Sequence, residues 1–249
     1  LIHVDKGSIL HSHNYSGTGA WLNEGQIWLG HHFGSQSADK DHIPFEIKGR
    51  FENAEGALFS STEKDNVIVS SELLNKGTGL YSVLTVAKDG SSHNKGEESG
   101  KAIDVQEGGK HVNEGTSFFK KVSVAGLIQN FKDFIIGSDS STSTLADPVT
   151  DADGDQKAFE VAAGGRFENK GNLAASSIQT SQIAGELDNT GVANYNDMVI
   201  ADSGSATTSN YEKGEWLTVN GSHSNSKVSI WNRIDVAKTG KQENSGSLD

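Results

Sequence analysis

One short phrase occurs twice in the chain, and this repeat limits what the chain can fold into. The segment FENAEGALFSS begins at Phe51, and the similar segment FENKGNLAASS begins at Phe167. A duplicated globular domain would repeat many more residues than this, whereas a coil of short, similar turns repeats only the positions that each turn needs. The repeat therefore favours a coil of stacked turns, in which each copy of the phrase opens one turn.

Asparagine recurs along the chain at intervals that fit such a coil. Short steps of about 20 residues alternate with long steps of 30 to 39 residues, and glycine follows most of the anchor residues two positions later. The anchors are Asp5, Asn23, Asn53, Asn75, Asn113, Asn130, Asn169, Asn189, Asn225 and Asn244. A period near 20 residues with Gly/Asn corners is typical of a parallel β-solenoid. Because asparagine tolerates tight corners and can hydrogen-bond to the next asparagine, we expect the nine asparagines to form a ladder at one corner.

Short apolar segments with strand alternation open and close the long steps, as in IWL at 27–29 and FEI at 45–47. The polar stretches between such segments lie at residues 30–43, 88–101, 138–157 and 202–214. Because they are rich in Gly, Ser, Asp and Lys, they indicate loops inserted at one recurrent place in alternate turns. Such loops are expected to form one row suited to binding, because loops on a rigid frame can vary without disturbing the core.

These patterns together predict a single all-β domain over residues 1–249, a right-handed parallel β-solenoid of about ten turns. The chain begins at Leu1, and Asn244 opens a turn that the chain does not complete. Solenoids need polar caps over their terminal strands. We therefore expect either a segment of a longer coil or copies that join end to end.

Composition removes several classes of partner and chemistry. The formal net charge of −12 opposes binding to nucleic acid or to an anionic membrane surface, because both require a basic surface. The absence of cysteine excludes thiol catalysis, disulfides and zinc–thiolate sites. No apolar run is long enough to cross a bilayer, so we expect no membrane insertion.

The x-N-x-G-x-[L/F] turns, the acidic cysteine-free composition and the Ser/Gly-rich texture resemble the β-helical exoproteins of two-partner secretion. These include filamentous-haemagglutinin-like adhesins and contact-dependent inhibition proteins. The resemblance implies Gram-negative-type export to the medium or the cell surface and a non-enzymatic role as a stalk or adhesin. It also implies that the partners are glycans or proteins of a host or neighbouring cell, or neighbouring copies. A carbohydrate-active lyase or hydrolase on the same scaffold is the first alternative, and a structural filament subunit is the second.

The segment DPVTDADGD offers one candidate metal site. Its carboxylates, Asp147, Asp151, Asp153 and Asp155, surround a glycine, and dense oxygen ligands on a turning loop are what calcium requires. A solvated acidic loop is the alternative, and we expect no other cofactor. A second candidate is the histidine group His11, His13, His31, His32 and His42, since imidazole suits zinc, copper or nickel.

Two aromatic residues are candidates for ligand binding. Tyr211 and Trp216 flank the polar turn YEKGEW, where one face of each ring can stay in contact with water and stack against a sugar. Packing within the core or at the edge of a turn is the alternative. No catalytic residue is predicted, because a catalytic arginine should occur once, whereas Arg50 and Arg166 occupy the same place in two duplicated turns, directly before the repeated phrase.

Overall fold

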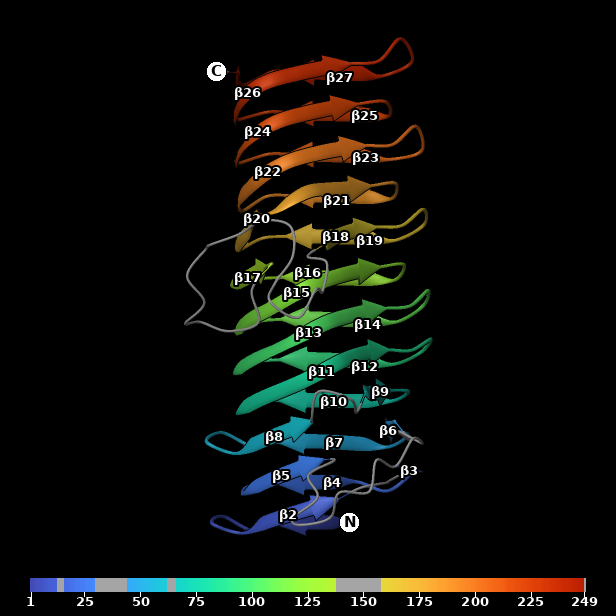
Figure 1. Ribbon diagram of the computed structural model, residues 1–249, viewed down its shortest axis with the longest axis vertical. Coiled ribbons are helices and arrows are strands. Elements are labelled where there is room, and N and C mark those ends of the chain that lie inside the picture. Colours follow the sequence, from blue (N-terminus) through green and yellow to red (C-terminus); the bar gives the residue numbers. More distant parts are fainter. Residues whose placement is uncertain (13–15, 30–43, 62–65, 138–157, 249) are drawn as a thin grey trace, which may run out of the picture.

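The computed structural model describes residues 1–12, 16–29, 44–61, 66–137 and 158–248 (Figure 1). These residues form twenty-eight β-strands, in two sheets of twelve and sixteen strands, and no helix. All strand pairs are parallel, and each strand pairs with its equivalent one turn away (Figure 1). The twelve strands of the first sheet delimit about eleven stacked turns, so the predicted all-β parallel solenoid of about ten turns is confirmed.

The first sheet has one short strand per turn. In order, these strands are β1 (Ile2–Val4), β4 (Trp21–Asn23), β7 (Arg50–Asn53), β10 (Glu72–Asn75), β12 (Ser91–Asn94), β14 (Lys110–Asn113), β16 (Leu127–Asn130), β19 (Arg166–Asn169), β21 (Glu186–Asn189), β23 (Ser205–Thr208), β25 (Ser222–Asn225) and β27 (Lys241–Asn244).

The second sheet completes each turn with either one long strand or two short ones. The strands of its main path are β2 (Ile9–Ser12), β5 (Gln26–Leu29), β8 (Leu58–Ser61), β11 (Thr78–Val86), β13 (Glu97–Val105), β15 (Thr116–Val124), β17 (Asp133–Ile136), β20 (Asn172–Ile183), β22 (Val192–Ile200), β24 (Tyr211–Val219), β26 (Val228–Val236) and β28 (Ser247–Leu248). Four further strands, β3 (Ser16–Gly17), β6 (Phe45–Ile47), β9 (Asn66–Val69) and β18 (Ala158–Val161), lie beside the second halves of the long strands or beside one another.

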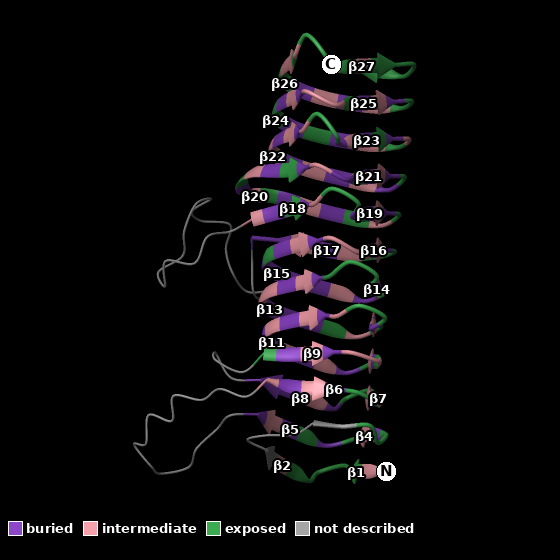
Figure 2. Ribbon diagram, turned by 90° about the vertical axis from the view of Figure 1, so that its right-hand side faces the viewer, coloured by how far each residue is buried: buried purple, intermediate pink, exposed green. Residues whose placement is uncertain are grey.

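The core is a set of columns that run along the axis of the coil. In most strands of the first sheet the second and fourth residues are buried, while the first and third contact solvent. Figure 2 shows this as bands of buried and less buried residues that alternate along the strands. The phenylalanine that opens the repeated phrase fills one such column, because Phe51 pairs with Leu73 of the next turn and Phe167 pairs with Leu187. All four are at most 2% exposed. The phrase repeats because each copy supplies an inward-facing strand of the first sheet.

The last residue of each first-sheet strand forms a second inner column, the asparagine ladder. In register, the column contains Val4, Asn23, Asn53, Asn75, Asn94, Asn113, Asn130, Asn169, Asn189, Thr208, Asn225 and Asn244. At eight steps the side-chain amide donates to Oδ1 of the next asparagine at 2.7–2.9 Å. Most of these amides also donate to a backbone carbonyl at the corner of the next turn, so the ladder satisfies polar groups that the corner would otherwise leave bare.

The expectation of loop insertions in alternate turns is wrong at two of its four places. Residues 88–101 contain β12 and the start of β13, and residues 202–214 contain β23 and the start of β24. Each of these long steps is in fact two turns, because Asn94 and Thr208 are ladder positions that the sequence pattern missed. The first anchor was also shifted by one residue, since Val4 and not Asp5 pairs with Asn23.

Extra residues do enter the coil at one recurrent place, the bend in the second sheet. Long strands such as β11 pass through this bend, whereas in other turns the chain is divided there, as between β8 and β9 and between β17 and β18. The predicted insertions 30–43 and 138–157 fall at the same point, between β5 and β6 and between β17 and β18, and both lie outside the described residues. In β20 the pairing register with β22 shifts at this bend, between Ala175 and Thr180.

Candidate functional site

The two aromatic residues predicted to bind ligand both lie on β24. Two consecutive outward residues, Glu215 and Trp216, mark the bend of this strand, and Tyr211 lies before it. The structure therefore places Tyr211, which is half-buried, on a different face from Trp216 and does not combine the two rings into one platform. Trp216 is 40% exposed and is the candidate that the structure leaves accessible.

Side chains from three successive turns surround Trp216. The strand register places Asp197 of β22 on one side of it and Arg233 of β26 on the other. The Arg233 guanidinium lies 4.4 Å from the centre of the Trp216 ring, a cation–π contact, and Asn232 beside it donates a hydrogen bond to Glu215. We call Asp197, Glu215, Trp216, Asn232 and Arg233 the Trp216 patch.

The charges of the Trp216 patch are partly compensated. Arg233 pairs with Asp235 through two contacts, Nε to Oδ1 at 3.1 Å and Nη2 to Oδ2 at 2.8 Å. Burial, and then the negative charge of Glu215, raises the pKa of Asp197, against a backbone hydrogen bond from Trp216 that lowers it. The Trp216 ring has the Arg233 guanidinium over one face and carboxyl and amide groups nearby, so the patch combines an apolar surface with hydrogen-bonding groups.

The sequence pointed to Trp216 but not to the residues around it. Asp197 and Arg233 lie one turn before and one turn after Trp216, at separations of about 20 residues. A register that counted β23 as a turn would have aligned the three positions. The signal was therefore present in the sequence but could be used only with the correct number of turns.

The two arginines that directly precede the repeated phrase occupy equivalent places. Arg50 and Arg166 are the first, outward-facing residues of β7 and β19, and each lies 3.1 Å from the glutamate two positions later, Glu52 or Glu168. A hydrogen bond to Asp188, together with the nearby acidic charges, raises the pKa of Arg166 further above its usual value. These contacts are consistent with a structural role that comes with the repeat.

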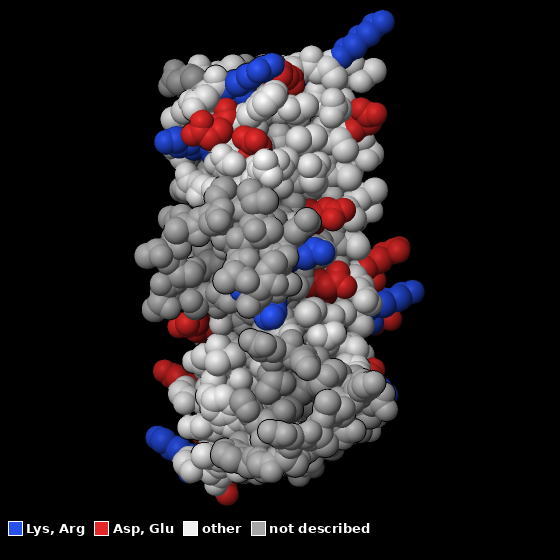
Figure 3. All heavy atoms as spheres, in the orientation of Figure 1, with Lys and Arg blue, Asp and Glu red and all other residues white. Residues whose placement is uncertain are grey.

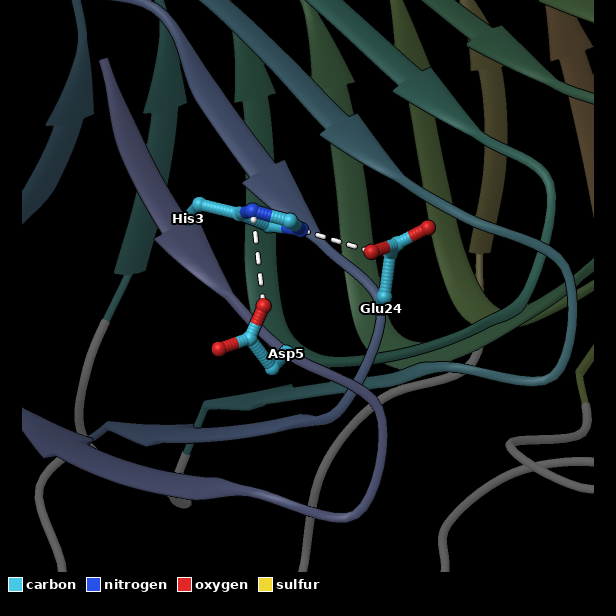
Figure 4. A group of neighbouring side chains, drawn as sticks. All are labelled: His3, Asp5 and Glu24. Atoms are coloured by element: carbon cyan, nitrogen blue, oxygen red, sulfur yellow. Dashed lines mark hydrogen bonds and ion pairs between the residues drawn. The ribbon is translucent and has the colours of Figure 1, made fainter.

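Three exposed residues, His3, Asp5 and Glu24, lie close together at the first corner of the coil (Figure 4). Figure 4 shows the ring of His3 between two carboxylates: Nδ1 lies 3.5 Å from Asp5 and Nε2 lies 2.6 Å from Glu24. A chelated metal would take one ring nitrogen together with both carboxylates, but here the carboxylates face different nitrogens. The arrangement suits an imidazole ring that bridges two carboxylates better than a metal centre.

Charged side chains on the face drawn in Figure 3 are interspersed. Over the described atoms of this face, acidic and basic groups lie among a larger area of uncharged residues and do not gather into a patch of one sign. Within the described part of the chain, no helix has the length and apolar character needed to cross a bilayer.

The predicted calcium ligands Asp147, Asp151, Asp153 and Asp155 lie outside the described residues, as do His13, His31, His32 and His42. His11 belongs to β2, but its side chain is not described. Both metal sites stay predictions. Comparison with known proteins gives no relative: no family model, no curated protein and no solved structure matches the chain.

Proposed function

We propose that this chain is a non-enzymatic structural segment of an exported or cell-surface protein, a stalk or adhesin repeat region. The observation that supports this proposal is the continuity of the coil, in which successive turns reuse the same ladder column and the same apolar columns. A solenoid built in this way is a stiff rod whose outer residues can vary without disturbing the core. Such a rod suits a protein that extends a recognition surface from a cell.

The Trp216 patch is the surface that we propose for recognition. The partner is a glycan or a protein of a host or neighbouring cell. A glycan is favoured because the face of the Trp216 ring that Arg233 does not cover can stack on a sugar, with hydrogen-bonding groups nearby. The sequence suggested a row of four loops for binding, but two of these segments form strands. We therefore propose the outer face of the second sheet, and not the row of loops, as the binding surface.

Binding can be tested with a pair of matched aromatic substitutions. Trp216→Ala is expected to weaken binding to cells or to a glycan array about tenfold, because stacking contributes on the order of 1 kcal/mol beyond buried area. Phe131→Ala is the control, since Phe131 is 42% exposed and also has a cation over its ring, Lys170 Nζ at 4.9 Å. Phe131→Ala should leave binding unchanged, and both variants should keep the melting temperature of the original chain.

If the original chain binds no cell and no glycan, the adhesin role is contradicted and the role as a stalk is retained. Equal loss of binding in both variants would show that the Trp216 patch is not the specific binding site. Joining of copies end to end, the other proposed partnership, is tested by sedimentation velocity over a range of concentrations. A single species at all concentrations would contradict the filament alternative.

One observation favours the enzyme alternative as a second candidate. Asp197 and Glu215 come from adjacent turns, and the raised pKa of Asp197 beside the charge of Glu215 is the pairing that polysaccharide hydrolysis uses. Incubation with acidic and neutral polysaccharides, followed by assay of new reducing ends and of unsaturated uronates, separates the two functions. Turnover that Asp197→Asn abolishes would replace the adhesin by an enzyme.

A further inference from the structure

The interior of the coil contains a buried polar cluster centred on Glu98 of β13. Glu98 Oε1 accepts a hydrogen bond from Ser117 Oγ of β15 at 2.6 Å, and His111 Nε2 of β14 lies 3.0 Å from the same oxygen. The side chains of Glu98 and His111 are both 0% exposed. The other carboxylate oxygen, Oε2, both ring nitrogens of His111 and the buried Tyr81 hydroxyl have no hydrogen-bond partner among the described residues, so Nε2 of His111 is close to Glu98 without being aligned for a hydrogen bond. We call Glu98, His111 and Ser117 the Glu98 cluster.

A second cluster of the same construction is centred on Glu212 of β24. His223 Nε2 of β25 lies 2.8 Å from Glu212 Oε1, which also accepts hydrogen bonds from Ser229 at 2.5 Å and from Trp231 Nε1 at 3.3 Å. Glu212 Oε2 accepts a hydrogen bond from Thr208 at 2.6 Å. This cluster, Glu212 with His223 and Ser229, is named the Glu212 cluster.

The two clusters occupy corresponding places in the coil. In each, the histidine is the second residue of a first-sheet strand, and the serine pairs in register with the glutamate of the turn before. A tyrosine of the preceding turn, Tyr81 or Tyr195, lies near each glutamate, whose charge adds to burial in raising the pKa of that tyrosine. The sequence carries the signal as H-x-N-x-x-x-S-x-[F/W], in HVNEGTSFF at 111–119 and HSNSKVSIW at 223–231.

Ionisable groups are rare inside the coil, and these clusters hold most of them. Among the described residues, the buried ionisable side chains are Tyr81, Glu98, His111, Lys120, Tyr195, Glu212 and His223. Lys120 lies at the bend of β15 and has an interaction of its own. The columns that hold Glu98 and His111 are filled by apolar residues in other turns, for example by Leu173 and Ile128. Most turns therefore fill these columns with apolar side chains, and the stacking of turns does not depend on the Glu–His pairs.

A buried glutamate and a buried histidine stabilise each other only while both are charged. Protonation of the glutamate leaves the imidazolium in the apolar interior without a counter-charge, which is strongly unfavourable. The groups that face Glu98 and Glu212 from the neighbouring strands are the two histidines, the neutral tyrosines and hydroxyl or indole donors. No second carboxylate in these clusters can take over the role.

We propose that the Glu212 cluster is an acid-operated release point, which holds its turns together near neutral pH and opens them locally when Glu212 is protonated. The inference is independent of the proposed function. It assigns a local response to acidification to one interior site of the rod.

The direction of the effect follows from Glu212. Burial alone would raise the pKa of Glu212, but the interactions with His223, Ser229 and Thr208 outweigh burial and lower it. A carboxyl whose pKa is lower in the folded than in the unfolded state contributes stability that is present above its unfolded value and is lost as the pH falls through the folded value. For the Glu212 cluster the response is therefore expected on the acidic side of the ordinary glutamate range.

Hydrogen exchange read by mass spectrometry tests the proposal on the unmodified chain. Between pH 7 and pH 3.5, after correction for the intrinsic exchange rates, peptides covering β24–β26 should lose at least tenfold in protection. Peptides covering β19 and β21, whose inward-facing residues include no ionisable side chain, should change by less than threefold. Equal loss of protection along the whole coil, or no loss at β24–β26, would overturn the proposal.

An apolar replacement of the buried pair gives an internal comparison. The double variant Glu212→Leu and His223→Leu places in each column a residue type that other turns already have there, Leu173 and Leu187, and such replacements of buried pairs commonly keep the fold. The acid response should disappear from β24–β26 in this variant, whereas Glu243→Gln, at an exposed residue of β27, should leave the response in place. Persistence of the response at β24–β26 in the double variant would contradict the assignment.

Discussion

Asn113→Ala is expected to lower the free energy of unfolding by about 3 kcal/mol or more, because it interrupts the asparagine ladder at its middle. Asn113 Nδ2 donates to Asn130 Oδ1 at 2.8 Å and to the backbone carbonyl of Asp133 at 2.9 Å. Its Oδ1 accepts from Asn94 Nδ2 at 2.9 Å and from the Gly115 amide at 3.2 Å. Alanine leaves these four partners buried without their hydrogen bonds, and each loss costs about 1–3 kcal/mol when water cannot enter.

The measurement is equilibrium denaturation followed by circular dichroism, with a matched asparagine outside the ladder as control. Asn196 is half-buried, and its Nδ2 makes a hydrogen bond of the same kind at the surface, donating to the Gln179 carbonyl at 3.1 Å. Asn196→Ala should cost less than about 1 kcal/mol, because water can replace the lost bond. A cost for Asn113→Ala no larger than for Asn196→Ala would show that the ladder does not stabilise the stack.

The parallel solenoid could be predicted from the sequence because its requirements recur at every turn. Asparagine at the corner and an apolar residue two positions before it are local signals, and they identified the phrase shared by the strands that hold Phe51 and Phe167. Asn94 fits the same N-x-G pattern, followed by Gly96, yet its turn was assigned to a loop. The reason is that inward positions of this turn are polar: Ser92 and Glu98 are buried there and look in the sequence like loop residues.

Buried polar groups thus explain both the missed turns and the missed clusters. The turn that contains Thr208 lacks the ladder asparagine, and the hydroxyl of Thr208 bonds to Glu212. The Glu212 carboxylate can be buried because Ser229 and His223 of the next turn interact with it. In the sequence these partners are separated from Glu212 by most of a turn. Hydropathy alone cannot reveal such an arrangement, whereas the alignment of complete turns can.

His223→Leu is expected to lower the free energy of unfolding at pH 7 by about 3–5 kcal/mol, the typical cost of removing one partner from a buried ion pair. Leucine is compatible with this inner column, which contains Leu187 two turns earlier, so the cost is electrostatic rather than steric. What remains is the Glu212 carboxylate, 1% exposed and without the imidazole that lies 2.8 Å from it. His93→Leu is the control, because the His93–Glu114 pair at 3.1 Å is partly exposed and should contribute less than about 1 kcal/mol.

The pH dependence separates the loss of charge pairing from a simple packing defect. Without His223, burial is the largest influence on Glu212 and raises its pKa relative to the original chain. Protonation of Glu212 therefore increases the free energy of unfolding of the variant, whereas it decreases that of the original chain. The difference in stability between the two should therefore narrow as the pH is lowered from 7 towards 4. Adding Glu212→Leu to His223→Leu removes the lone carboxylate and should recover most of the loss at pH 7. A deficit that is independent of pH and is not recovered in the double variant would show that His223 acts through packing, and that the buried pair carries no electrostatic function.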